Sequence, residues 1–205
     1  MKRLTVFVFF VLFFTTIFSQ EQSSKDDIRP NNVFGFFSNF GICQPVGSHV
    51  ATDIVTPHGK EAYSLGFRYQ RPISKKFSIE TGICYSKYAI INHLVDHNIN
   101  DYLHEILKTI SVPVLLRQYY PNNYFLRFGS MIEFGLSRKG EYGITDAQTG
   151  FGISIGAGKE FFLNKFSLDI APNLDIHSII PFSSHLFQQK LIVLGLKIGL
   201  CYNLN

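Results

Sequence analysis

Apolar and polar residues alternate with a period of two along most of this chain. The clearest case is the final segment, residues 190–204, in which every even position from Ile192 to Leu204 is apolar. The odd positions are mostly small or polar and include Lys197. Because successive side chains of a β-strand point to opposite faces, this pattern predicts a strand with one apolar face and one small or polar face.

The same alternation predicts eight strands, each near the length that a tilted strand needs to cross a bilayer. Their expected ranges are 33–43, 62–72, 77–88, 106–119, 124–137, 149–162, 166–178 and 189–204. Short connections at 72–76, 120–123 and 163–165 alternate with longer ones at 44–61, 89–105, 138–148 and 179–188. Outer-membrane barrels have this asymmetry, with short periplasmic turns and long outer loops.

The small and polar residues at alternate positions of the predicted strands, here called the polar row, indicate which face lies inside. That row is rich in glycine and carries sparse, mixed charges, whereas the apolar row is large and aromatic. A row that faced water would carry far more Lys and Glu. We therefore predict an all-β fold, an eight-stranded antiparallel up-and-down transmembrane β-barrel in the outer membrane, with lipid against its apolar face. A soluble exported barrel that binds a small apolar ligand inside is the alternative.

Nine charged residues fall on the predicted inner face and are expected to form a charge network in the lumen. They are Arg68, Glu80, Arg117, Arg127, Glu133, Glu160, Asp169, Asp175 and Lys197. Four positive and five negative groups nearly cancel, as a sealed interior requires, because an unpaired buried charge is costly. Eight strands enclose only enough space for side chains, so we expect a filled lumen rather than an open pore.

The N-terminus has the features of a cleaved secretory signal peptide. Lys2 and Arg3 precede an apolar run from Val6 to Phe14, which is too short to span a membrane as a helix. We expect a signal peptide at 1–19, a periplasmic segment at 20–32 and the barrel domain at 33–205. Loss of the signal peptide lowers the formal charge from +4 to +2, too weak a balance to indicate nucleic-acid binding.

The residue patterns predict no catalytic, cofactor or metal site. Ser178, Ser183, Ser184, His177 and His185 fall near one predicted rim, but no nucleophile elbow surrounds them. Three cysteines are expected to be small residues of the packed interior. They are Cys43, Cys84 and Cys201.

Histidines concentrate in the predicted outer loops, with His177 close below them. The loop histidines are His49, His58, His93, His97, His104 and His185. No defined ligand spacing appears among them, so solvated loop residues are the simpler interpretation. A cell-surface binding module for a metal or a host or matrix ligand is a second functional hypothesis.

Several segments resemble the PorT-like outer-membrane barrel family of Bacteroidetes. They are ISVPVLLR at 110–117, YYPNNYFLRFG at 119–129, FGISIGAGKEF at 151–161 and LGLKIGLCYNL at 194–204. The resemblance covers nearly the whole chain after the signal peptide and implies an eight-stranded outer-membrane barrel. The family's founding member is tied to protein secretion. The leading hypothesis is therefore a non-enzymatic outer-membrane barrel that serves a secretion or envelope complex.

Overall fold

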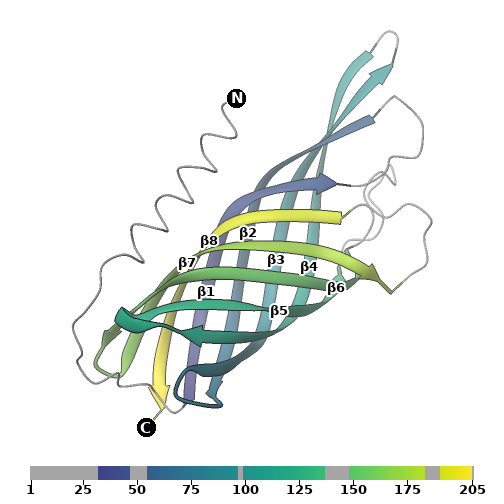
Figure 1. Ribbon diagram of the computed structural model, residues 1–205. Helices are drawn as coiled ribbons and strands as arrows, with labels where there is room; N and C mark the ends of the chain where they lie inside the picture. Colours follow the sequence, from purple (N-terminus) through teal and green to yellow (C-terminus); the bar gives the residue numbers. More distant parts are fainter. Residues whose placement is uncertain (1–31, 47–54, 97–98, 137–147, 183–189, 205) are drawn as a thin grey trace.

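The computed structural model describes residues 32–46, 55–96, 99–136, 148–182 and 190–204 (Figure 1). The predicted signal peptide and nearly all of segment 20–32 lie outside the described residues. The strands are β1 (Asn32–Val46), β2 (Val55–Pro72), β3 (Phe77–Asp96), β4 (Ile99–Tyr119), β5 (Tyr124–Gly135), β6 (Gly150–Leu163), β7 (Phe166–Pro181) and β8 (Lys190–Leu204).

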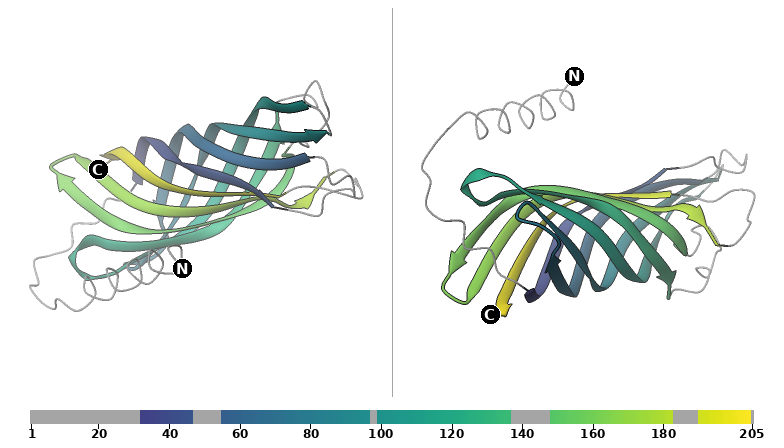
Figure 2. Two further views of the ribbon diagram at one scale, coloured as in Figure 1. Left: turned by 90° about the horizontal axis from the view of Figure 1, so that it is seen from above. Right: turned by 60° about the horizontal axis from the view of Figure 1, so that its bottom comes forward.

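The eight strands form one closed antiparallel barrel in chain order. Closure is made by β1 and β8, which pair from Asn32 opposite Leu204 to Val46 opposite Lys190. Closure leaves no strand edge that would have to bury unpaired backbone groups in lipid. The predicted fold is confirmed, and the strands are strongly tilted in every view (Figures 1 and 2).

The connections define two ends of the barrel. The turn end carries the short links β2–β3, β4–β5 and β6–β7, the second of which is a 3-10 helix at Pro121–Asn123. It also carries Asn32 and Leu204, the first and last residues of the barrel. The loop end carries the other connections, at 47–54, 97–98, 136–149 and 182–189.

Two of the predicted long loops are wrong. Strand β2 already begins at Val55, and the predicted loop 89–105 is a hairpin in which β3 and β4 stay paired as far as Asp96 opposite Ile99. The polar residues of this stretch resemble a loop in the sequence, but its Ile and Val residues favour strand. The hairpin reaches beyond the neighbouring strands at the loop end (Figure 1).

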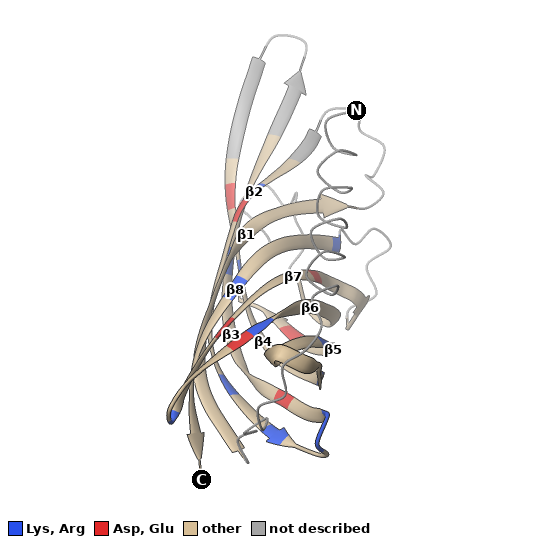
Figure 3. Ribbon diagram, turned by 60° about the vertical axis from the view of Figure 1, so that its left-hand side comes forward, with Lys and Arg blue, Asp and Glu red and all other residues tan. Residues whose placement is uncertain are grey.

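Apolar side chains cover the outside of the barrel. Phe67 and Leu200 are 61% and 52% exposed, whereas Arg68 and Lys197 on the inner face are only 2% and 7% exposed. Charged residues occupy only short segments of the ribbons (Figure 3). Soluble proteins rarely expose a continuous apolar belt of this kind, but a lipid bilayer requires one. The alternative of a soluble barrel with an apolar interior is therefore wrong.

Some apolar residues do point inward. Phe37 is 5% exposed, and the free cysteines Cys43, Cys84 and Cys201 are all buried in the lumen, as expected.

Within the described ranges, no helix is long and apolar enough to cross a membrane.

Candidate functional site in the barrel lumen

Seven buried charged side chains, one from each of the strands β2 to β8, gather in the lumen on the side of the turn end. We call them the lumen cluster: Arg68, Glu80, Arg117, Arg127, Glu160, Asp169 and Lys197. Each occupies an inward position of the two-residue alternation. Together they carry four positive and three negative charges.

Glu80 of β3 lies at the centre of the lumen cluster. Its Oε1 is 3.4 Å from Lys197 Nζ and 3.8 Å from Arg127 Nη1. Its Oε2 is 3.7 Å from Arg117 Nη1 and 3.8 Å from Arg68 Nη1. One fully buried carboxylate therefore lies within 3.8 Å of four cations, which come from β2, β4, β5 and β8.

Two further carboxylates complete the pairing of Arg117. Its Nη2 donates to Glu160 Oε2 at 2.8 Å, and its Nη1 lies 3.4 Å from Asp169 Oδ2, which also pairs with Arg68. The guanidinium stacks 3.6 Å from the centre of the Phe125 ring, a favourable cation–π arrangement. These contacts hold the Arg117 side chain of β4 against residues of β5, β6 and β7.

Arg127 is the least satisfied member of the lumen cluster. Its side chain is fully buried, and none of its guanidinium nitrogens has a hydrogen-bond partner among the described residues. The separation of 3.8 Å from Glu80 is too long for a direct hydrogen bond. Its contribution is therefore electrostatic, through the shared carboxylate.

Glu133 lies outside the lumen cluster, nearer the loop end. It pairs with the ring Nδ1 of His177 and accepts a hydrogen bond from the Ser178 backbone N–H at 3.0 Å. The other ring nitrogen, Nε2, is 3.2 Å from the Tyr88 hydroxyl. His177 is thus buried in the lumen near the loop end of β7, on the inner face that the alternation predicts, but the sequence did not identify Glu133 as its partner.

Asp175 is also separate from the lumen cluster. Its carboxylate accepts hydrogen bonds from Ser154 Oγ at 2.6 Å and from Asn173 Nδ2 at 2.7 Å. The nine residues predicted as one network thus divide into the lumen cluster, the Glu133–His177 pair and Asp175. The alternation indicates which side chains face inward, but not the height of each along the barrel axis.

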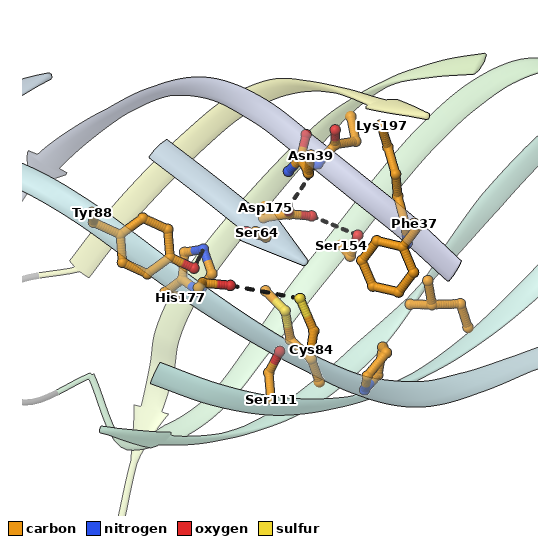
Figure 4. Close-up of a pocket in the computed structure, with 15 residues that line it drawn as sticks. Phe37, Asn39, Ser64, Cys84, Tyr88, Ser111, Ser154, Asp175, His177 and Lys197 are labelled. Atoms are coloured by element: carbon orange, nitrogen blue, oxygen red, sulfur yellow. Dashed lines mark hydrogen bonds between the residues drawn. The ribbon is translucent and has the colours of Figure 1, made fainter. Parts of the chain in front are cut away.

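A small cavity of about 40 Å³, lined by both polar and apolar side chains, lies between these groups (Figure 4). Asp175, Asn173 and Asn39 line it, as do Lys197 at the lumen cluster and His177. Toward the loop end the interior becomes apolar, in a core of Cys43, Ala62, Tyr88, Ile90, Leu107, Leu191 and Val193. Along the barrel axis the lumen therefore contains the lumen cluster, the small cavity and an apolar layer.

The other chemical candidates are not assembled into a site. His58, His93 and His104 lie on β2, β3 and β4 rather than in loops, while His49, His97, His185, Ser183 and Ser184 lie outside the described residues. In the part of the chain that the structure describes, no three His, Cys, Asp or Glu side chains are grouped to hold a metal ion.

Solved structures with the same fold are outer-membrane proteins. OprG from Pseudomonas aeruginosa matches with a TM-score of 0.54 and 12% identity, over 86% of this chain and 98% of OprG. AlkL, solved in lipid bilayers, matches with a TM-score of 0.50 and 10% identity, over 91% and 96%. No protein-family model and no curated protein sequence matches the chain. From its closed barrel and apolar exterior, the chain is an eight-stranded β-barrel of the outer membrane.

Proposed function

We propose that this protein is a non-enzymatic outer-membrane barrel with a closed lumen, which serves a structural role in a secretion or envelope complex. The lumen cluster is the observation that carries the proposal. It joins seven of the eight strands across the interior through charges that are at most 7% exposed. An interior tied together in this way supports the barrel wall and leaves little room for solute flow.

The closed lumen follows from the cost of opening it. A pore would require Glu80 and Asp169 to leave the guanidinium groups that neutralise them, and unpaired charges in a low-dielectric interior are strongly unfavourable. The cavity of about 40 Å³ has room for a few water molecules at most, since one water needs roughly 10–15 Å³ of such a cavity. The apolar layer toward the loop end adds a second barrier.

The same burial argues against catalysis by the lumen carboxylates. An acid–base pair needs a substrate within hydrogen-bond reach, and Glu80, Glu133 and Glu160 are at most 2% exposed. Pairing with Arg or His accounts for each of them structurally.

A role in secretion or in an envelope complex is supported by the resemblance to the PorT-like family. The test is a clean deletion, followed by comparison of the secreted and surface proteins with those of the parent strain. We expect specific proteins to be lost from these fractions and restored by a wild-type copy. An unchanged protein profile would refute the secretion role.

A surface binding module is the second candidate, and the β3–β4 hairpin favours it. Strand β5 ends at Gly135 opposite Thr109, whereas β4 continues on its loop-end side back to Ile99. A chain with this hairpin shortened to end near Asn92 and Leu103, which pair with each other, keeps Tyr88, Ile90 and Leu107 of the apolar layer and most of the pairing between β2 and β3. If the protein is a binding module, this chain should lose a metal, host or matrix ligand while the secreted proteins stay unchanged.

A further inference from the structure

Among the described residues, the charged side chains on the outer surface of the turn end are all positive. We call them the basic rim: Arg71, Lys75 and Lys76 around the β2–β3 turn, and Lys159 and Lys165 around the β6–β7 turn. Glu80, Glu160 and Asp169 also lie toward this end, but they face the lumen and are at most 2% exposed. Figure 3 shows blue segments at the turns near the C-terminus. The outer surface of this end is therefore basic.

The loop end has a different balance of charge. Glu61 of β2 is exposed there beside Lys60, and the β3–β4 hairpin carries Asp96 and Asp101. The segment 20–31, which leads into β1 at the turn end, has three acidic and two basic residues, too few acids to neutralise five cations. The positive charge is thus confined to the turn end, and it favours an anionic partner there.

Lys159 lies on the lipid-facing wall of the barrel. It occupies the outward row of β6 with Phe161 and is paired across the ladder with Tyr124. Its Nζ is 5.0 Å from the centre of the Tyr124 ring and 5.5 Å from that of Phe161. Aromatic girdles mark the interfaces of outer-membrane barrels, and a lysine there extends its ammonium toward the headgroups. Lys159 is therefore placed to contact a lipid phosphate.

Exposed apolar side chains accompany the other cations of the basic rim. Ile73, within the β2–β3 turn, is 60% exposed, and Leu163, two residues before Lys165, is 62% exposed. Arg71 lies in the outward row of β2, directly opposite the exposed Ile79 of β3. Cations interleaved with apolar side chains suit the boundary between hydrocarbon and headgroups, which favours a lipid surface over an acidic protein.

We infer that the basic rim binds the anionic headgroups of phospholipids in the periplasmic leaflet, with phosphatidylglycerol as the probe. Short turns of outer-membrane barrels face the periplasm, so the rim lies on that side. Each Lys or Arg near a membrane surface favours anionic lipid by about five-fold, and salt screens this attraction. Because β2–β3 and β6–β7 are separate parts of the closed strand order, the rim contacts several lipids around the barrel. This inference goes beyond the proposed function and does not depend on it.

The test measures which lipid the barrel gathers at its surface. The full mature chain is refolded into phosphatidylcholine vesicles, and electron paramagnetic resonance compares the immobilisation of spin-labelled phosphatidylglycerol with that of spin-labelled phosphatidylcholine. We expect the protein to favour phosphatidylglycerol several-fold at low salt, and the preference to shrink in about 0.5 M NaCl. This comparison does not rely on the folding of any variant. Equal immobilisation of the two lipids at low salt would overturn the inference.

Two triple variants with the same change of charge separate the basic rim from the net charge of the protein. The rim variant combines Arg71→Gln, Lys159→Gln and Lys165→Gln. The control variant combines three exposed cations nearer the loop end, Lys60→Gln, Lys87→Gln and Lys190→Gln. We expect the rim variant to lose at least about half of the preference for phosphatidylglycerol, and the control variant to stay close to the wild type, because acidic residues offset the loop-end cations. An equal loss in both variants would contradict the assignment.

Soluble poly-glutamate distinguishes a lipid surface from an acidic protein as the partner. It is added to the wild type and to the rim variant in phosphatidylcholine vesicles that contain no anionic lipid. Capture of poly-glutamate by the wild type alone, together with equal immobilisation of the two spin-labelled lipids, would assign the basic rim to an acidic protein and overturn the inference.

Discussion

Removal of the Glu80 charge tests whether the lumen cluster holds the barrel together. Glu80→Gln keeps the side-chain volume but raises the net charge of the cluster from +1 to +2, and it removes the shared partner of four cations at 3.4–3.8 Å. Breaking a buried ion pair by neutralising one partner typically costs about 3–5 kcal/mol. We expect a loss of this size in the free energy of unfolding.

The measurement is urea unfolding of the refolded protein in lipid vesicles. Because the chain has no Trp, far-UV circular dichroism reports the loss of strand structure. The matched control is Glu61→Gln, which neutralises an exposed carboxylate of the neighbouring strand β2 and should change stability by no more than about 0.5 kcal/mol.

A double variant distinguishes charge imbalance from a local packing fault. Lys197→Gln added to Glu80→Gln returns the cluster to a net charge of +1. We expect the double variant to be more stable than the sum of the two single losses, because the residues are in contact. If Glu80→Gln costs no more than Glu61→Gln, the lumen cluster does not stabilise the barrel and the reasoning fails.

Three further substitutions probe the lipid-facing exterior, the Glu133–His177 pair and the close contact between Gly199 of β8 and the Arg68 side chain. Phe40→Arg, at a 54% exposed position in the middle of β1, should cost about 2–4 kcal/mol in bilayers, whereas Phe40→Leu should be nearly neutral; equal effects would contradict a lipid-facing exterior. His177→Ala should cost about 3–5 kcal/mol because it leaves the Glu133 carboxylate without its partner, and added Glu133→Gln should recover much of that loss in the same urea assay. Gly199→Val should lower stability by roughly 1–3 kcal/mol, because its side chain would displace the Arg68 guanidinium; an unchanged urea midpoint would show that the cluster accommodates the extra volume.

The wall of the barrel could be predicted from the sequence because a strand repeats every two residues. In β8 the alternation from Ile192 to Leu204 is nearly unbroken, and the structure places its apolar row outside. The β3–β4 hairpin was missed because Asn92 and Asp96 interrupt the apolar pattern while backbone pairing continues through them.

The contacts inside the lumen were harder to predict, because they depend on how far each strand is shifted along the barrel axis relative to the others. Glu133 and Glu160 both face inward, yet Glu133 lies near the loop end of β5 and Glu160 near the turn end of β6. The expected strand ranges already place them toward opposite ends, but the contacts that each makes across the lumen also depend on the register, which sets Glu133 opposite Gly150. The alternation placed His177 on the inner face together with Asp175, but it could not reveal Glu133, two strands away, as the partner of His177.

A closed lumen is the central claim, and planar-bilayer recording of the purified wild-type protein tests it most directly. The account predicts no steady conductance above that of the bare bilayer, because paired charges and an apolar layer fill the interior. Stable, large conductance steps from the intact chain would contradict it.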